Sequence, residues 1–221
     1  LSGANLMTSA FTINGGKVTV TNSTGSATGT GTVTVGNSAT LAGTGTIAGG
    51  VVVNSGATLA PGNNAIGTLK LGNSLILQTG SKTIVEVSGT ANDKLTVTGS
   101  VILKGTLEMQ NIGAAYQVGQ SYYIFTAASA TGAFDAISPE IPGPGLRWNT
   151  SHITEGIISV DVADGITDSP TSSYPYIKIY PNPAKDFCRI NLGELKGEAT
   201  IELINEIGQV FVTEHTNTDI P

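Results

Sequence analysis

Short apolar runs recur along the first half of the chain, and this repetition limits the possible folds more than any other feature. The segment VTVGNSATLAG at residues 33–43 superimposes on VVVNSGATLAP at residues 51–61 with a shift of 18 positions (51 − 33 = 18). An earlier copy begins at Val18, 15 positions before Val33 (33 − 18 = 15), and a later one begins at Leu75, 24 positions after Val51 (75 − 51 = 24). Each copy combines a β-branched run with a polar turn. We therefore predict short strands joined by tight corners.

A single repeat of this size cannot bury its own apolar residues, so neighbouring coils must stack on one another. Between Gly15 and Leu107, coils of about 19 residues predict roughly five turns that rise by about 4.8 Å each. The composition agrees with this picture, because 29 glycines, 12% charged residues and many β-branched residues disfavour both helices and disorder. The predicted fold class is all-β, with a solenoid in the first half of the chain.

The composition and apolar pattern of the sequence change three times along the chain, which predicts four regions. Residues 1–111 carry the solenoid repeats, and residues 112–163 hold three of the six tyrosines together with Trp148. We expect this second region to be a β capping segment, since the last coil of a solenoid leaves an open sheet edge. Residues 164–175 are rich in Ser, Thr, Asp and Pro and predict a linker. Residues 176–221 show alternating apolar positions that predict a second, small β domain.

Charge, hydropathy and cysteine content exclude several classes of partner. The net charge is −6 with only ten lysines and arginines, which argues against a nucleic-acid partner. No apolar run approaches the roughly 18 residues that span a bilayer, so we expect no membrane insertion. The single cysteine, Cys188, is expected to be a free thiol in a strand. The chain lacks an initiator Met, and we interpret Leu1 as an internal residue of a longer precursor.

The region from Val33 to Val162 resembles the autotransporter-associated β-strand repeats of bacterial surface proteins. The segments that carry this resemblance are GNSATLAGTGTI, NSGATLAPGN, NDKLTVTGSVILKGTLEM, GQSYYIFTA, TGAFD, LRWNTS and GIISVDV. The resemblance implies a passenger-type, right-handed parallel β-helix with a β cap, and an adhesin-like role at the cell surface. The handedness of the coil comes from the resemblance alone.

The last part of the chain resembles the type A C-terminal sorting domain of type IX secretion substrates from Bacteroidetes. The segments IYPNPAKDFCRINL at residues 179–192 and ATIELINEIGQVF at residues 199–211 carry the resemblance. It implies an Ig-like β-sandwich and recognition by the type IX secretion machinery. It also implies export through the periplasm and outer membrane to a secreted or cell-surface location. The chain stops at Pro221, before the final strand that the family pattern contains, so the predicted sandwich is partial.

Two groups of residues are candidates for contact with partners. The first is the sorting-signal motif, in which a proline-rich turn and a hairpin glycine end or reverse strands; its members are Tyr180, Pro181, Asn182, Pro183, Ala184 and Gly208. The second is a set of aromatic residues that we expect to be exposed for ligand contact, such as glycan binding: Tyr122, Tyr123 and Trp148. For Trp148 we favour packing within the cap over a role as a sugar platform.

We predict no catalytic residue, metal ligand or cofactor. The NDK segment indicates a turn, so Asp93 and Lys94 are expected to be solvated. Asp161, Asp164 and Asp168 lack the spacing of a calcium loop. His152 and His215 are isolated in the sequence and are expected at surface or strand positions.

Three functions from different classes remain open at this point. The leading hypothesis is a non-catalytic stalk followed by a secretion address, in a large surface protein. The second is a solenoid that binds carbohydrate or host surfaces. The third is the C-terminal part of a polysaccharide-active enzyme whose catalytic domain precedes Leu1.

Overall fold

The computed structural model describes residues 1–62, 64–163, 178–180, 189–191, 197–204 and 209–217. The chain divides into two compact units, Leu1–Ile166 and Thr167–Pro221. Within the described ranges the regular structure consists of strands and one 3₁₀ helix, η1 (Ile153–Glu155). The fold is therefore all-β, as predicted. None of the described residues belongs to a helix with the length and apolar character needed to cross a bilayer.

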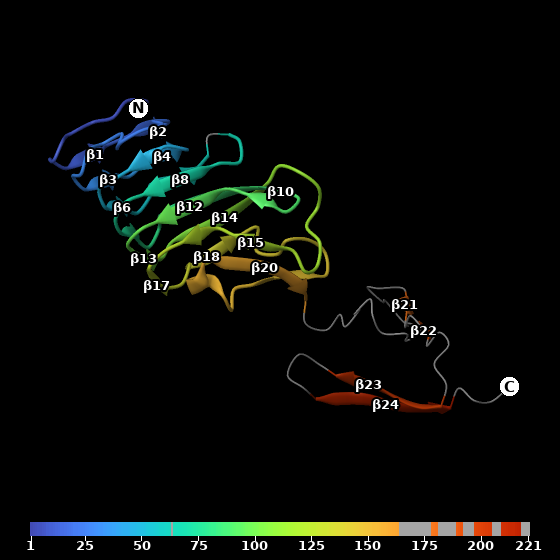
Figure 1. Ribbon diagram of the computed structural model, residues 1–221. Helices are drawn as coiled ribbons and strands as arrows, with labels where there is room; N and C mark the ends of the chain where they lie inside the picture. Colours follow the sequence, from blue (N-terminus) through green and yellow to red (C-terminus); the bar gives the residue numbers. More distant parts are fainter. Residues whose placement is uncertain (63, 164–177, 181–188, 192–196, 205–208, 218–221) are drawn as a thin grey trace. The chain divides into compact units, whose positions relative to one another are not determined.

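Three sheets built from parallel pairs form most of the first unit (Figure 1). The six-stranded sheet consists of β1 (Phe11–Ile13), β3 (Val33–Val35), β6 (Val51–Val53), β9 (Leu75–Leu77), β13 (Ser100–Leu103) and β17 (Ser129–Gly132). The seven-stranded sheet consists of β2 (Gly16–Val20), β4 (Ala39–Gly43), β7 (Thr58–Pro61), β10 (Lys82–Ser88), β14 (Thr106–Asn111) and β18 (Ala136–Ser138), with β11 (Ala91–Asn92) paired antiparallel to β10. The four-stranded sheet consists of β5 (Thr46–Ile47), β8 (Thr68–Leu71), β12 (Lys94–Val97) and β16 (Phe125–Thr126).

Successive strands of the chain join the three sheets in turn. Strands β3, β4 and β5 pair with β6, β7 and β8, respectively, so each sheet gains one strand from each successive segment of the chain. Figure 1 shows these strands following one another from the N-terminus towards the region drawn in yellow. This order explains why repeated sequence segments lie side by side in space.

The register confirms two of the three predicted repeat shifts. Val33 pairs with Val51 and Val51 pairs with Leu75, which are the shifts of 18 and 24 positions. The shift assigned to Val18 is wrong, because Val18 pairs with Leu41 on the seven-stranded sheet rather than with Val33. The partner of Val33 in the earlier coil is Phe11. Two short apolar strands of similar composition follow each other in the repeats, such as β1 and β2. The sequence pattern does not distinguish them, so it assigns β2, in place of β1, as the equivalent of β3.

The core lies between the three sheets, and one side of each strand faces it. Alternating burial is clear in β3 and β6, whose first and third residues are buried while the central residue is half-buried. The largest inward side chains are leucines and isoleucines of successive coils, among them Leu41, Ile47, Leu59, Leu71 and Leu107. Their stacking in register follows from period-two alternation in strands that share a sheet.

Glycines allow the coils to approach closely at one corner. A Cβ atom on Gly49 would overlap the carbonyl oxygen of Gly31, and a Cβ atom on Gly31 would overlap the carbonyl oxygen of Ser9. The backbone of three successive coils is therefore stacked at this corner without intervening side chains.

An antiparallel sheet follows the parallel ones in the predicted capping segment. It consists of β15 (Ser121–Tyr123), β20 (Ile157–Val162) and β19 (Leu146–Asn149), with β20 in the centre. Within the same segment, β16, β17 and β18 form the last strands of the three parallel sheets. Residues 112–163 thus combine the last strands of the three parallel sheets with a separate antiparallel sheet.

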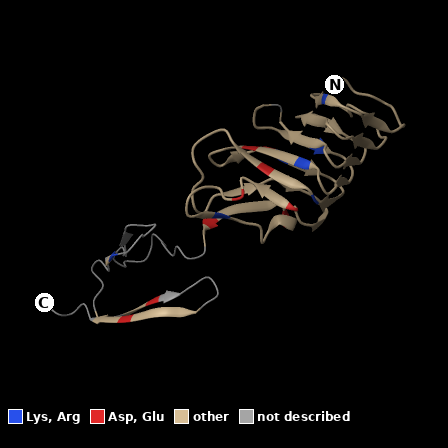
Figure 2. Ribbon diagram, turned by 180° about the vertical axis from the view of Figure 1, so that it is seen from behind, with Lys and Arg blue, Asp and Glu red and all other residues tan. Residues whose placement is uncertain are grey.

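Charged residues are unevenly distributed along the first unit (Figure 2). The first acidic residue of the sequence is Glu86, and only Lys17 and Lys70 carry charge before Lys82. The early coils are therefore nearly uncharged. Most charged side chains of the first unit, which are the candidates for a functional site, therefore lie from Lys82 onward.

The described part of the second unit contains two antiparallel strand pairs. Strands β21 (Lys178–Tyr180) and β22 (Arg189–Asn191) form one pair, and β23 (Glu198–Ile204) and β24 (Val210–Asn217) form the other.

Candidate functional site

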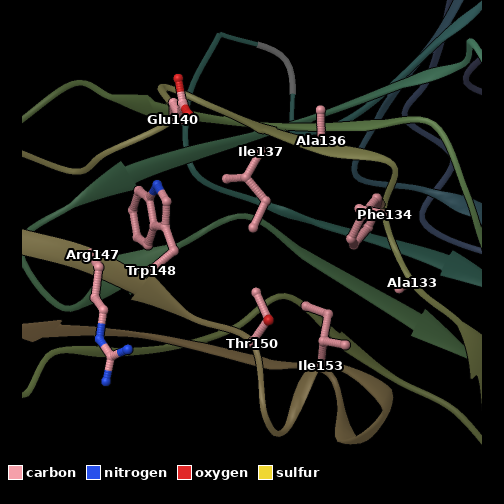
Figure 3. Close-up of a pocket in the computed structure, with 9 residues that line it drawn as sticks. All are labelled: Ala133, Phe134, Ala136, Ile137, Glu140, Arg147, Trp148, Thr150 and Ile153. Carbon is pink, nitrogen blue, oxygen red and sulfur yellow. The ribbon is translucent and has the colours of Figure 1, made fainter. Parts of the chain in front are cut away.

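A cleft in the capping segment is the first candidate site, and Trp148 lines it (Figure 3). Its volume is about 380 Å³, and it lies between the segment that contains β18 and the segment that contains β19 and η1. Figure 3 shows Phe134, Ile137, Trp148 and Ile153 around the centre of the cleft. The side chains of Glu140 and Arg147 extend away from that centre. Apolar side chains therefore dominate the centre of the cleft, where Thr150 adds a hydroxyl group, and the two charged groups lie at its margin.

The indole of Trp148 is held in place by two contacts. Its ring packs edge-on against the ring of Tyr116, with the centroids 4.9 Å apart and the planes at 77°. Its Nε1–H donates a hydrogen bond to the carbonyl oxygen of Pro139 at 2.8 Å. Trp148 thus has the packing role that the sequence analysis favoured. Contact between Trp148 and a ligand stays a prediction.

The two adjacent tyrosines do not share the exposed position that we expected. Tyr123 is 56% exposed, whereas Tyr122 is fully buried. The Tyr122 hydroxyl donates to Oε1 of Gln120 at 2.7 Å and lies 3.2 Å from the carbonyl oxygen of Gly89. Burial raises the pKa of this phenol above its ordinary value. Neighbouring residues of a strand point to opposite faces, so one of the two tyrosines had to face the core. The prediction that Tyr122 contacts a ligand at the surface is therefore wrong.

The expectation that Asp93 is solvated is also wrong, because its carboxylate is buried. The residue is 1% exposed and lies between β11 and β12. Its Oδ1 accepts a hydrogen bond from the backbone N–H of Gly67 at 2.7 Å, and its Oδ2 accepts one from the N–H of Glu86 at 3.0 Å. The chain reverses at residues 89–90, between β10 and β11, and the NDK segment instead joins β11 to β12, with the carboxylate of Asp93 folded inward to bind backbone donors. Sequence pattern alone gave no sign of these distant partners.

The electrostatics of Asp93 reflect this burial. Desolvation is the largest influence and raises the pKa of the carboxyl group from 3.8 to about 6. The negative charge of Glu86 acts in the same direction, whereas the hydrogen bonds from Glu86 and Gly67 act against it. Asp93 therefore changes its protonation state in mildly acidic solution.

Asp93 and Glu86 line one part of a surface groove over the seven-stranded sheet. This groove has a volume of about 290 Å³. Its lining comes from five strands, their ends and the nearby loop, and includes Lys17, Thr40, Thr58, Asn64, Lys82, Glu86, Asp93 and Gln110. The groove is more polar than the cap cleft. The ammonium of Lys82 lies 2.8 Å from Oε2 of Glu108, so this lysine already has an anionic partner.

Other carboxylates of the first unit also have structural partners. Oδ2 of Asp135 accepts a hydrogen bond from the N–H of Gly105 at 2.8 Å. Oδ2 of Asp161 lies 2.8 Å from Nδ2 of Asn149 and 3.9 Å from a guanidinium nitrogen of Arg147. These groups hold backbone and neighbouring side chains in place. Asp164 and Asp168, which were considered with Asp161, lie outside the described residues.

The histidines occupy exposed positions, as expected. Nδ1 of His152 lies 3.0 Å from Oε1 of Glu155, and both side chains are more than half exposed. Nδ1 of His215, on β24, lies 3.0 Å from Oγ1 of Thr200 on β23. Across the described parts of the chain, no three His, Cys, Asp or Glu residues come together in a group suited to a metal ion.

The C-terminal strand pairs carry the described part of the predicted sorting region. Tyr180 ends β21 and pairs with Arg189, and Ile201 of β23 pairs with Glu214 of β24. On β24, Val210, Phe211 and Val212 are 49%, 68% and 45% exposed. Five of the six residues of the predicted signal motif, Pro181, Asn182, Pro183, Ala184 and Gly208, lie outside the described residues, as does Cys188.

Residues 178–220 match the family model of the secretion system C-terminal sorting domain. This match covers the region in which the sequence analysis found the type IX sorting signal. A search of proteins with curated functions gives no match to the chain.

The sorting domain implies that the chain is a substrate of the type IX secretion machinery. It also implies export, followed by release or retention at the cell surface. The match does not extend to the parallel sheets, so their likeness to autotransporter repeats stays a prediction.

Proposed function

We propose that residues 1–163 form a capped, right-handed β-helix that serves as a non-catalytic stalk of an adhesin-like surface protein. The observation that carries this proposal is the repeated visit of the chain to three parallel sheets, followed by a type IX sorting domain. In this view residues 176–221 belong to an Ig-like sandwich that delivers the stalk to the secretion machinery. Bacteroidetes are the bacteria in which we expect such a protein.

A continuous outward row on the six-stranded sheet supports the solenoid. Thr12 pairs with Thr34, Thr34 with Val52, and Val52 with Ile76. The row continues from Ile76 to Ile102 and from Ile102 to Thr131. Five steps of about 4.8 Å predict a rise of about 24 Å from the first residue of the row to the last.

The interior of the coils supports a structural role. Successive inward positions hold fully buried leucines, valines and isoleucines. The buried carboxylate of Asp93 and the exposed carboxylate of Asp135 accept hydrogen bonds from backbone N–H groups of neighbouring segments. Such contacts stabilise the coils against one another, which is what a rigid spacer needs.

Distance measurements on paired spin labels test the solenoid. With Thr12→Cys and Thr131→Cys introduced in a Cys188→Ser background, we expect a label separation centred near about 24 Å, broadened by the label linkers. The matched pair Thr12→Cys and Ile102→Cys should lie one coil closer, near about 19 Å. Equal distances for the two pairs would contradict the stacked arrangement, because both pairs use the same outward row.

Export tests the role of the C-terminal region. Residues 176–221, together with any sequence that follows them in the precursor, would be deleted in a host that has type IX secretion. We expect the shortened protein to accumulate in the periplasm. The matched control carries Thr58→Ala, an outward substitution on β7, and should reach the surface or the medium. Normal export of the deletion variant would refute the sorting function.

Glycan binding at the cap cleft is the second candidate function. The observation that favours it is a cleft of about 380 Å³ with an indole in its lining, since aromatic rings supply flat apolar surfaces for recognition. We rank it second because the Glu140 and Arg147 side chains extend away from the centre.

A glycan array tests this second candidate. Trp148→Phe keeps an aromatic ring against Tyr116 but loses the Nε1–H bond, whereas Ile137→Gln changes the opposite wall of the cleft. If the cleft binds glycans, Ile137→Gln should remove a signal that Tyr123→Phe, which lies outside the cleft lining, retains. Absence of any signal from the parent chain would favour the stalk alone.

A further inference from the structure

The chain turns between β1 and β2 at Asn14 and Gly15, which we call the first corner. Both residues are exposed, and they form the single Asn–Gly dipeptide of the sequence. Strands β1 and β2 are the end strands of their sheets, so among the described strands each pairs on one side, with β3 and β4 respectively. The first corner therefore lies at an end of the stacked strands and is accessible to water.

The two groups that can react with one another at this corner are both free. An asparagine loses its side-chain amide when the next backbone nitrogen attacks Cγ and closes a five-membered imide. Glycine in the next position favours this attack, because it has no side chain in the way and restricts the backbone least. Among the described residues, none forms a hydrogen bond with the Asn14 side chain or with the N–H of Gly15. No such bond has to break before the two groups meet.

The space around the first corner allows the backbone to rotate. A Cβ atom on Gly15 or on Gly16 would have no heavy atom within 4 Å. The preceding residue, Ile13, is buried, and its carbonyl oxygen accepts a hydrogen bond from the N–H of Gly36 at 2.8 Å. The chain is thus anchored at Ile13 and free at the two residues that follow.

The equivalent corner between β3 and β4 shows how such a site is closed. It contains Asn37 and Ser38, and the N–H of Ser38 donates to the carbonyl oxygen of Gly56 at 3.0 Å. A Cβ atom on Gly56 would overlap Oδ1 of Asn37, so the next corner of the chain lies directly against that side chain. Attack by the Ser38 nitrogen on Asn37 would break this hydrogen bond. Stacking therefore protects the second corner, and no described residue holds the first corner in this way.

We propose that Asn14 is a site of spontaneous deamidation in the folded protein, and that its isoaspartyl product loosens the pairing of β1 with β3. The nitrogen of Gly15 gives its proton to a base in the solvent and bonds to Cγ of Asn14. The bond from Cγ to Nδ2 breaks, and ammonia leaves. Water then opens the imide at one of its two carbonyl groups and leaves aspartate or isoaspartate. The net reaction consumes one water molecule, releases one ammonia molecule and involves no oxidation or reduction.

The modification changes the charge of the first corner. Either product adds one negative charge where Lys17 is the only charged side chain among residues 1–69. The attacking nitrogen must lose its proton, so the reaction is faster at higher pH. This inference concerns the chemistry of the corner and does not depend on the proposed stalk or on the sorting role.

Isoaspartate also lengthens the backbone, because the main chain then runs through the former side chain and gains one methylene group. The first corner consists of two residues, and the strands on either side have fixed registers: Ile13 pairs with Val35, and Gly16 pairs with Ala39. A longer link between two fixed strands disturbs the end of β1, where Ile13 accepts its hydrogen bond. Aspartate adds the same charge but leaves the backbone at its original length.

Peptide mapping of the full chain during incubation in mildly alkaline buffer tests the modification. We expect the peptide that contains Asn14 to change from the amide to the acid, in two forms that chromatography separates, while Asn37 keeps its amide. Gly15→Ala should lower the rate at Asn14 by about tenfold or more, because alanine restricts the backbone and hinders the attack. Alanine fits here, since Gly15 has no positive φ and leaves room for a Cβ atom. The control Thr12→Ala, an exposed substitution on β1, should react at the parent rate.

A synthetic peptide of residues 10–18 shows whether the fold protects Asn14. The rate in the folded chain should lie within about tenfold of the rate in the peptide, because the reaction requires no opening of the fold. A larger difference, or equal rates at Asn14 and Asn37 in the folded chain, would overturn the proposal.

Amide exchange followed by NMR tests the effect on the backbone. The isoaspartyl form, isolated by chromatography, should exchange the Gly36 amide at least about tenfold faster than the unmodified chain. Asn14→Asp adds the charge without the methylene group and should keep the rate of the unmodified chain. Unchanged exchange in the isoaspartyl form would refute the loosening of β1. Equally fast exchange in Asn14→Asp would also contradict it, because charge rather than backbone length would then be the cause.

Discussion

Leu41 and Leu59 lie directly opposite one another on strands β4 and β7, and both are fully buried. They are 18 positions apart in the chain (59 − 41 = 18), so the pair joins two sequence repeats rather than stabilising one. Replacing Leu59 by Ala should lower the free energy of unfolding of the first unit by about 2–5 kcal/mol, because it leaves a cavity between coils. Urea unfolding followed by circular dichroism measures this loss.

The neighbouring outward residue provides the control for Leu59. Thr58→Ala should cost less than about 1 kcal/mol, since its side chain is only half-buried and the substitution changes mainly strand propensity. Equal losses for the two variants would show that the inward row does not carry the stability of the coils.

Gly49 and Gly50 form a matched pair for testing how closely the coils approach. A Cβ atom on Gly49 would overlap the carbonyl oxygen of Gly31, whereas a Cβ atom on Gly50 would lie 3.5 Å from Oγ of Ser74 in ordinary contact. Gly49→Ala should therefore lower the free energy of unfolding by about 1–3 kcal/mol, the usual cost of overpacking. Gly50→Ala should leave the unfolding midpoint nearly unchanged. Thermal unfolding of both variants decides the matter, and a larger loss for Gly50→Ala would contradict the corner geometry.

Tyr122 and Tyr123 allow a buried and an exposed hydroxyl group of the cap to be compared. Tyr122→Phe removes a buried hydroxyl that donates to Gln120, and should cost about 1 kcal/mol. Tyr123→Phe changes an exposed residue and should cost less than about 0.5 kcal/mol. Both variants keep the fluorescence of Trp148, the only tryptophan of the chain, as the probe of unfolding. A greater loss in Tyr123→Phe would indicate that the exposed face of β15 has an unrecognised partner.

Tyr116 should make the cap sensitive to alkaline pH. Burial raises the pKa of its phenol from 10.0 to about 12, with a smaller contribution from Tyr122. The contribution of this group is present below pH 10 and is lost as the pH rises through about 12, because the unfolded chain releases the proton first. Rapid absorbance titration at the phenolate band should show a late step whose amplitude is smaller in Tyr116→Phe, because Tyr122 also has a raised pKa and contributes to it. A late step of unchanged amplitude in that variant would refute the buried environment of Tyr116.

Much of the repeat architecture was accessible from sequence because strand pairing follows the spacing of the apolar runs. The shifts from Val33 to Val51 and on to Leu75 were right, since these runs begin equivalent strands of successive coils. The assignment of Val18 failed because each coil contains two similar short runs, and the pattern does not say which one begins the coil. Phe11, the true partner of Val33, belongs to a run without the VTV pattern.

The candidate sites were less accessible, since they depend on contacts between distant residues. The hydrogen bond from Gly67 to Asp93 joins positions that are 26 residues apart, and nothing local in the NDK segment signals it. The burial of Tyr122 depends on its place opposite Ile158 in the antiparallel sheet. The sorting region was the exception, because its two segments are recognisable without knowing where their side chains point.

The sequence by itself determined the all-β class, the spacing of two pairs of repeated strands and the C-terminal sorting region, because period-two alternation and family segments are local properties of a chain. Only the tertiary structure decided which strand pairs with which, which tyrosine is buried, and that Asp93 links two strands from within the protein. These outcomes depend on the surroundings that each side chain acquires when the strands pair into sheets. Burial and hydrogen bonding by residues many positions away set the free energy of a charged or polar group, and no window of sequence contains that information.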